Sequence, residues 1–271
     1  MPTKTRSTIP QSLALITGAS SGIGLEFARV LAGEGNDLLL VSQDETKLRH
    51  AAKELQHAFP SARITHLAAD LSDAKGVQKV IDAVRSQKSH VHTLINNAGY
   101  ALYGRFWETD SEQETRMLEL NIIALTRLTK AFLPAMIARK RGIVVNVAST
   151  AAFQPGPLMA TYYASKAYVL SFSEAIANET QGTGVSVTCL CPGPTESNFQ
   201  SRAKMLDSRI AREGRLMPAR VVAEEGWRGA KAGKSVVIPG LRNQLGTIAA
   251  RLAPGSLSAQ VVRNIQERKK E

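Results

Sequence analysis

The feature that most constrains the fold is the stretch Thr17-Gly-Ala-Ser-Ser-Gly-Ile-Gly24, which lies between an apolar run and a helical pattern. Residues 13–16 are continuously apolar, as in a buried strand, and the apolar residues between positions 25 and 32 have helical spacing. Because glycines 18, 22 and 24 lack side chains, backbone N–H groups and a helix N-terminus can approach a pyrophosphate there. This position favours a nucleotide-binding turn over a simple tight turn.

The rest of the chain repeats the same alternation of strand and helix. Further strands are predicted at 37–41, 63–68, 91–95, 142–147, 185–190 and 235–238. Continuous apolar strands indicate a parallel sheet with helices on both faces, so the expected fold class is α/β, a Rossmann-like doubly wound sheet of about seven strands. Ligands of such sheets bind outside the carboxyl ends of the strands, and TGASSGIG, AADLS, NNAG, NVAST and CPGPTES each follow a predicted strand.

With 271 residues and 44% hydrophobic content, the chain predicts a single domain over 1–271. We expect a nucleotide-binding core with the catalytic residues at 12–190, a substrate loop and lid at 194–232, and a C-terminal helical extension at 241–271. Apolar positions 241, 245, 248 and 252 share one helical face, and 257, 261, 262 and 265 share another. Packing of these faces on the domain or on a partner subunit is favoured over membrane docking.

A formal net charge of +11 raises the question of a nucleic-acid or membrane partner. Lys and Arg are spread along the chain with few aromatic residues between them, which favours a basic enzyme that attracts anionic ligands, without nucleic acid. The first twelve residues lack a secretory pattern and no apolar run has transmembrane length, so we expect a cytoplasmic protein. Cys189 and Cys191 fall on one face of a strand and are expected to be buried and unbridged.

Taken in order, the motifs resemble those of the short-chain dehydrogenase/reductase family over roughly residues 12 to 240. They are the glycine turn after Thr17, Asp70-Leu71, Asn96-Asn-Ala-Gly99, Asn121, Ser149, Tyr162-x-x-x-Lys166 and Pro192-Gly193. The resemblance implies hydride transfer between a nicotinamide cofactor and a small-molecule carbonyl or secondary alcohol. It also implies a homodimer or homotetramer, because the helices that carry Asn121 and Tyr162 usually pack against a second subunit.

The resemblance assigns positions around the cofactor. Asp70 would accept from the adenine amino group, Leu71 would border the ring and Asn96 would lie beside the adenosine ribose, while the NNAG turn braces the sheet. Considered without the resemblance, Asp70 could equally be a helix cap, and the asparagines could equally be turn formers. The full expected cofactor set is Gly18, Ser20, Ser21, Gly22, Ile23, Gly24, Ser42, Gln43, Asp70, Leu71, Asn96, Ala98, Gly99, Tyr162, Lys166, Pro192, Gly193 and Thr195.

The end of the second strand bears on the choice between NAD and NADP. The family's NAD-type aspartate would fall at Ser42 and the arginine of NADP-type members at Gln43, and neither residue is charged. Both side chains can donate hydrogen bonds to a phosphate, and Lys47 and the positive charge of the chain would assist. NADP(H) is therefore favoured over NAD(H).

The pair Tyr162 and Tyr163 lies about one helical turn before Lys166. Ketone reduction creates an alkoxide that needs a proton, and a nearby ammonium is expected to lower the pKa of a tyrosine toward the useful range. Helical geometry leaves either phenol possible. The family pattern selects Tyr162 as the proton donor and acceptor.

Two further residues complete the expected catalytic set. Ser149 ends a predicted strand, where its hydroxyl can orient the substrate carbonyl. Asn121 is a polar residue on an otherwise apolar helix, and the resemblance gives it a water-linked proton relay to Lys166. No metal is expected, because the histidines at 50, 57, 66, 90 and 92 form no ligand cluster in the sequence.

Two other functions remain open. One is a non-catalytic protein that binds NADP(H) or nucleic acid, although such a protein has no use for the tyrosine-lysine pair. The other is an epimerase or dehydratase of the same superfamily, whose glycine turn commonly has a different spacing. An apolar substrate is expected from the residues around the predicted pocket, which are Phe153, Leu158, Met159, Phe199 and Met205.

Overall fold

The computed structural model describes residues 13–86, 90–196 and 216–267. Its centre is a seven-stranded, all-parallel sheet with the order β3-β2-β1-β4-β5-β6-β7. The strands are β1 (Leu13–Thr17), β2 (Asp37–Ser42), β3 (Ile64–Ala68), β4 (Val91–Asn96), β5 (Gly142–Val147), β6 (Val185–Leu190) and β7 (Val236–Val237). The predicted doubly wound sheet is confirmed, and its order reverses between β1 and β4, where ligands of such sheets bind.

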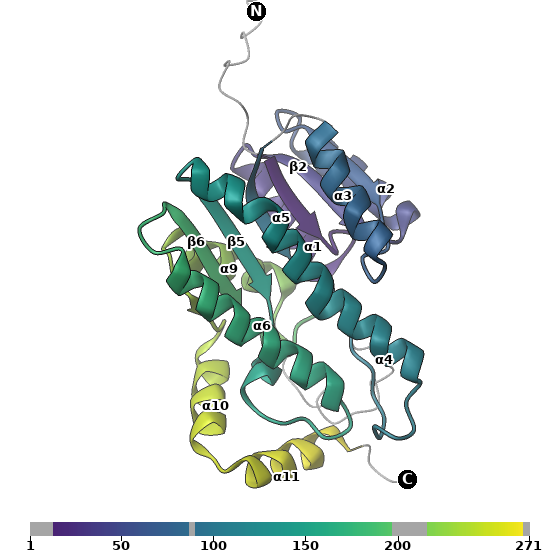
Figure 1. Cartoon of the computed structure of the whole chain (residues 1–271), viewed down its shortest axis with the longest axis vertical. Helices are drawn as coiled ribbons and strands as arrows, with labels where there is room; N and C mark the ends of the chain where they lie inside the picture. Colours follow the sequence, from purple (N-terminus) through teal and green to yellow (C-terminus); the bar gives the residue numbers. More distant parts are fainter. Residues whose placement is uncertain (1–12, 87–89, 197–215, 268–271) are drawn as a thin grey trace, which may run out of the picture.

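Helices cover both faces of the sheet, which explains why its strands read as continuous apolar runs. One face packs against α1 (Gly22–Gly33), α2 (Glu45–Ala58) and α9 (Ala219–Lys231). The opposite face packs against α3 (Ala74–Ser86), α5 (Leu125–Ala138) and α6 (Ala160–Glu179), and α5 and α6 lie across it in Figure 1. Cys189 and Cys191 are buried in β6 and just after it, with their Sγ atoms 3.6 Å apart and no disulfide, as predicted.

Helix α4 (Ser111–Leu118) runs into α5 through a π-helical turn at Glu119–Ala124. The continuous stretch Ser111–Ala138 is, among the described residues, the one helix with the length and mean hydropathy (1.3) to cross a membrane. Its residues Leu128, Phe132 and Met136 are buried in the cluster that covers the sheet. This packing is that of a core helix in a globular domain.

The C-terminal helices α10 (Leu241–Leu252) and α11 (Gly255–Gln266) lie together at the end of the molecule away from β2 and α2 (Figure 1). Most of the apolar positions on these helices do not pack on the domain, and the predicted alternative, that they contact a partner subunit, stays a prediction. Seven of these side chains are between 40% and 82% exposed: Leu241, Leu245, Ile248, Leu252, Leu257, Val261 and Ile265. The opposite side of these helices packs on the domain, where Thr247, Ser258, Val262 and Gln266 are buried. Val262 contacts the cluster that includes residues 100–103 of the loop after β4.

The predicted substrate loop leaves the sheet after β6 and returns at α9. Its two ends are held together, since Thr195 and Met217 form a parallel bridge and the Met217 N–H donates to the Pro194 carbonyl at 3.0 Å. Residues 197–215, including Phe199 and Met205, lie outside the described residues. The lid therefore stays a prediction.

Candidate active site

A cavity of about 590 Å³ lies at the carboxyl ends of the strands. It reaches from the glycine turn to α6 and α11, and most of the predicted residues line it. These are Gly18, Ser21, Gly22, Ile23, Ser42, Gln43, Asp70, Leu71, Ala98, Gly99, Ser149, Tyr162, Lys166, Pro192, Gly193 and Thr195. The nucleotide turn and the tyrosine-lysine pair therefore belong to one site.

The glycine turn has the shape of a phosphate cradle. Gly18 and Gly22 have φ angles of 65° and 56°, the left-handed region that favours glycine, and a Cβ on Gly18 would lie 2.7 Å from Asn97 Nδ2. Asn97 Nδ2 fixes the turn by donating to the Thr17 carbonyl at 3.0 Å. The Ser21 side chain makes no capping bond to α1, and the start of this helix, at Ser21, Gly22 and Ile23, lines the cavity. The turn fits a pyrophosphate.

Three predicted cofactor residues support the site without lining the cavity. Ser20 Oγ bonds Ser42 Oγ at 3.0 Å, and Gly24 allows α1 to approach the turn, since a Cβ there would lie 2.5 Å from the Gly18 oxygen. The placement of Asn96 beside the ribose stays a prediction, whereas the expected bracing of the sheet by this turn is observed. Asn96 is 3% exposed and its amide donates to Asn146 on β5 and to Thr129 on α5, because it braces the sheet.

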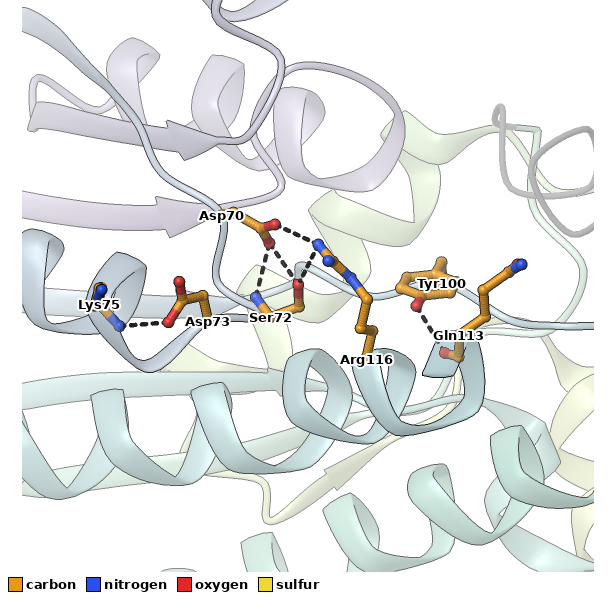
Figure 2. Close-up of polar contacts among 7 residues, drawn as sticks. All are labelled: Asp70, Ser72, Asp73, Lys75, Tyr100, Gln113 and Arg116. Carbon is orange, nitrogen blue, oxygen red and sulfur yellow. Dashed lines mark hydrogen bonds and ion pairs between the residues drawn. The ribbon is translucent and has the colours of Figure 1, made fainter. Parts of the chain in front are cut away.

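Asp70 lies in a polar cluster that sequence reasoning did not find (Figure 2). Its carboxylate accepts from the Ser72 N–H and hydroxyl at 2.9 and 2.7 Å and from Arg116 Nη2 at 2.7 Å. Partial burial raises the pKa of Asp70, but the hydrogen bonds from Ser72 and the charge of Arg116 outweigh it and hold the pKa below its usual value. Arg116 comes from α4 and also lines the cavity. No sequence motif indicates that Arg116 belongs to this site.

The polar residues at the end of β2 line the cavity, as predicted. The positive charge expected there is partly neutralised by a neighbouring carboxylate. Ser42, Gln43, Asp44 and Lys47 all line the cavity. Asp44 caps α2 by accepting from the Lys47 N–H at 3.0 Å, and its carboxylate also lies 2.8 Å from Lys47 Nζ. The ammonium expected to assist a phosphate is thus already paired.

Tyr162 and Lys166 are one helical turn apart on α6, and both are buried. Tyr162 forms a hydrogen bond with Ser149. Lys166 Nζ donates to the Val147 carbonyl at the end of β5 at 2.9 Å and lies 5.8 Å from the centre of the Tyr162 ring. These contacts fix both side chains against the end of β5 and the turn that Ser149 caps.

Burial controls the electrostatics of this pair. It raises the pKa of Tyr162 well above its ordinary value, and the hydrogen bond with Ser149 only partly opposes this rise. It also lowers the pKa of Lys166 to about 8. The predicted lowering of the Tyr162 pKa by Lys166 is therefore not seen in this structure, because burial disfavours the charged phenolate and is the largest cause of the shift.

Ser149 caps the 3₁₀ turn Thr150–Phe153 and still faces the cavity. Its hydroxyl oxygen accepts from the Ala151 N–H at 3.1 Å and its proton points to the Pro192 carbonyl at 3.4 Å. The capping role and the predicted substrate role are therefore compatible, because the cap holds the hydroxyl in place.

Asn121 lies in the π-helical turn and does not line the cavity. Its amide joins three segments: Nδ2 donates to the Tyr100 carbonyl at 3.0 Å and to Ser165 Oγ at 3.1 Å, and Oδ1 accepts from the Tyr100 N–H at 3.2 Å. A Cβ on Gly99 would lie 2.9 Å from Asn121 Oδ1 and 3.5 Å from Lys166 Nζ. Asn121 is close enough for a water-linked relay, which stays a prediction.

Tyr163 faces the cavity from the other side of Tyr162. The two rings meet edge to face, with centroids 6.0 Å apart at 79°. The Tyr163 hydroxyl accepts a hydrogen bond from Gln266 Nε2 at 2.7 Å. Gln266 lines the cavity from α11. It lies one helical turn after the buried Val262, and this spacing is the sequence signal that could have placed Gln266 on the inward face of the helix.

The predicted apolar wall is only partly observed. Met159 lines the cavity, together with Ala151. Phe153 and Leu158 are not among the described residues that do so. Phe153 instead packs under the Arg251 guanidinium, 4.7 Å from the ring centre, because α10 covers it.

Comparison with known proteins places these features in context. The family described as short chain dehydrogenase matches residues 12–206. A very-long-chain 3-oxoacyl-CoA reductase of Phaeosphaeria nodorum is 38% identical over 185 residues, which cover 65% of this chain and 53% of that protein. The chain spans about half the length of this reductase and of two similar reductases, from Pyrenophora tritici-repentis and Mycosarcoma maydis.

Solved structures match nearly the whole chain. A short-chain dehydrogenase from Sphingobium yanoikuyae in complex with NADPH has a TM-score of 0.79 at 29% identity, covering 96% of this chain and 98% of that one. A short-chain dehydrogenase/reductase from Burkholderia phymatum in complex with NAD has a TM-score of 0.79 at 25% identity, with the same coverages of 96% and 98%. Proteins of this fold thus hold either nicotinamide dinucleotide.

Proposed function

Because the chain belongs to the short-chain dehydrogenase/reductase family, whose members transfer hydride to and from a nicotinamide cofactor, we propose that it is an NADP(H)-dependent reductase of carbonyl compounds. The observation that carries the proposal is the position of Ser149, Tyr162 and Lys166 in the same cavity as the glycine turn. Tyr162 is the proton donor to the substrate oxygen.

The cofactor supplies the hydride when bound, and the chain's own residues manage the oxygen. The hydroxyls of Ser149 and Tyr162 hold the carbonyl oxygen, and Tyr162 gives its proton to that oxygen as the C–O bond becomes an alkoxide. With its pKa raised by burial, Tyr162 is a neutral phenol at neutral pH, which is the form that reduction consumes. Lys166 has further N–H donors besides the one bound to Val147, and these can hold the nicotinamide ribose.

The choice of NADP(H) is supported by the end of β2. Ser42 and Gln43 line the cavity as neutral donors, and the carboxylate of the next residue, Asp44, is engaged in the cap of α2 and the pair with Lys47. No carboxylate occupies the position that binds ribose hydroxyls in NAD-type members. The NADPH complex of the Sphingobium relative is consistent with this choice.

The substrate we favour is an apolar ketone or 3-oxoacyl compound. Met159, Ala151 and the ring of Tyr163 give the cavity an apolar wall beside the reacting hydroxyls. The similarity to a very-long-chain 3-oxoacyl-CoA reductase supports the same class. We further propose a cytoplasmic homodimer or homotetramer, since Ile123, Ile137 and Tyr168 are exposed apolar positions on the helices expected to meet a second subunit.

The test is reductase activity followed by NADPH absorbance over a panel of ketones, aldehydes and 3-oxoacyl thioesters. Tyr162→Phe should lower kcat by at least about 100-fold, as expected for a lost general acid. Tyr168→Phe, on the exposed side of the same helix, is the matched control, and Tyr163→Phe should cost far less than Tyr162→Phe. Full activity of Tyr162→Phe would refute the mechanism, and a failure to turn over every class would leave the epimerase and non-catalytic alternatives.

A further inference from the structure

Helix α11 brings one amide side chain to the wall of the cavity. Gln266 is 2% exposed and lines the cavity beside Tyr163. Two hydrogen bonds hold it there: its Nε2 donates to the Tyr163 hydroxyl at 2.7 Å, and its backbone carbonyl accepts from the Tyr103 hydroxyl at 2.8 Å. Its position is therefore fixed from both α6 and the loop after β4.

This amide has an unused polar atom. Among the residues that the structure describes, none donates a hydrogen bond to Gln266 Oε1, although the atom is buried. Turning the amide by 180° exchanges the two atoms, because the Tyr163 hydroxyl can also donate to the oxygen, and the nitrogen is then the unpaired atom. In either orientation a side chain that lines the cavity has one buried polar atom without a partner among the described residues, and buried polar groups nearly always have one.

We propose that Gln266 and Tyr163 form a polar subsite that binds a second polar group of the substrate, a hydroxyl or an amide N–H, away from the reacting carbonyl. The proposal rests on the reductase function above. Tyr163 meets the proton donor Tyr162 edge to face with centroids 6.0 Å apart, so the subsite lies about one aromatic ring from the reacting oxygen. Preferred substrates are therefore keto-alcohols or amide-bearing oxoacyl thioesters, with the apolar wall between their two polar groups.

The subsite predicts selectivity between matched substrates. One pair is a 3-oxoacyl N-acetylcysteamine thioester, which has an amide N–H, and the S-butyl thioester of the same acyl chain. The other pair is a ring ketone with and without a distal hydroxyl. For each pair, the ratio of kcat/KM between the polar and the apolar member is measured in the wild type, in Gln266→Met and in Tyr163→Phe.

Gln260→Met is the matched control, since Gln260 is an exposed residue of the same helix whose amide only contacts Asn264. The wild type and Gln260→Met should prefer the polar member of at least one pair. Gln266→Met should lower that ratio by about tenfold, mainly through KM, as expected for the loss of one hydrogen bond at a buried site. Tyr163→Phe should lower it in the same direction, because the hydroxyl that orients the amide is gone.

Thermal unfolding and NADPH fluorescence separate this effect from a loosened helix, because both should match the wild type if only the subsite changes. Equal kcat/KM for both members of both pairs in the wild type would overturn the subsite, as would an unchanged ratio in a folded Gln266→Met protein. A wild type that reduces none of the probes would refute the reductase function, and the subsite with it. The two failures are thus distinct.

Discussion

At the scale of single residues, the site depends on two ionisable groups that burial shifts in opposite directions. The pKa of Tyr162 is raised and that of Lys166 is lowered to about 8, so both shifts favour the neutral forms. A sequence pattern such as Tyr-x-x-x-Lys identifies the two residues of this pair but does not indicate how far each side chain is exposed to water. Solvation follows from the packing of α6 against β5, which leaves both side chains buried.

The lowered pKa of Lys166 predicts a particular pH dependence of stability. Between the folded pKa near 8 and the unfolded value near 10.5, the unfolded chain binds more protons, so the free energy of unfolding should rise with pH in this window. Relative to Lys166→Met, which cannot titrate there, the wild type should gain about 2 kcal/mol between pH 7 and pH 9.5. Urea unfolding of both proteins without cofactor at the two pH values measures this, and parallel pH profiles would contradict it.

Asp44 is predicted to weaken the selectivity for NADP(H) through its pair with Lys47. Asn caps a helix about as well as Asp, so Asp44→Asn should keep α2 intact while freeing the ammonium beside the cavity. The KM for NADPH should fall by about threefold, the scale of an exposed ion pair, with little change for NADH. Asp73→Asn, another carboxylate that accepts from a helix N-terminus, is the control. An equal effect on both cofactors would exclude this explanation.

At the scale of elements, the π-helical turn Glu119–Ala124 allows Asn121 to join the loop after β4 to α6. A π-turn amounts to one extra residue in an α-helix, and such turns are frequent at functional sites. Its register, rather than the asparagine alone, places the amide between Tyr100 and Ser165.

Deletion of Ile123, which is 42% exposed, should convert the turn to a regular α-helix and rotate Asn121 by about 100° relative to α5. Activity should fall by at least about 100-fold, since the loop after β4 and the contact near Lys166 lose their support. Ile123→Ala removes the same side chain but keeps the turn, so it should retain most of the activity. Comparable losses in both proteins would show that the side chain, and not the turn, matters.

The sequence predicted every strand within a residue or two, as well as the residues at the strand ends, because parallel strands bring their carboxyl ends to one edge. It missed Arg116 and Gln266, and it did not decide whether the outer faces of α10 and α11 pack on the domain or on a partner subunit. These features depend on how a helix is rotated about its axis when it meets loops distant in sequence, and periodicity fixes a helical face without naming its neighbour. Asn96, at the end of β4, braces the sheet as expected for the NNAG turn, through hydrogen bonds to Asn146 and Thr129.

At the scale of the whole molecule, the chain has a formal net charge of +11, and its cavity is the proposed binding site of a polyanionic cofactor. Charged residues that line the cavity near β2 and α4 are largely paired, as in Asp70 with Arg116 and Asp44 with Lys47. The attraction of an anionic cofactor therefore comes mostly from the long-range field rather than from local contacts.

This field predicts that kcat/KM for NADPH falls by several-fold as salt rises from about 0.02 to 0.3 M, because screening shortens the reach of the charges to about 6 Å. NADH has less negative charge and should show a shallower dependence. Measurements with both cofactors in the same salt series test this. Identical slopes would mean that the field does not discriminate between them.

Gly18, in the glycine turn, and Gln266, in α11, both line the cavity, so residues near both ends of the described chain contribute to it. During synthesis on the ribosome, the nucleotide half can fold while the tyrosine cluster still lacks Val262 and the amide beside it. A nascent chain stalled before α11 should therefore bind nucleotide yet expose an apolar surface to chaperones. Substrate recognition would be among the last properties that the growing protein acquires.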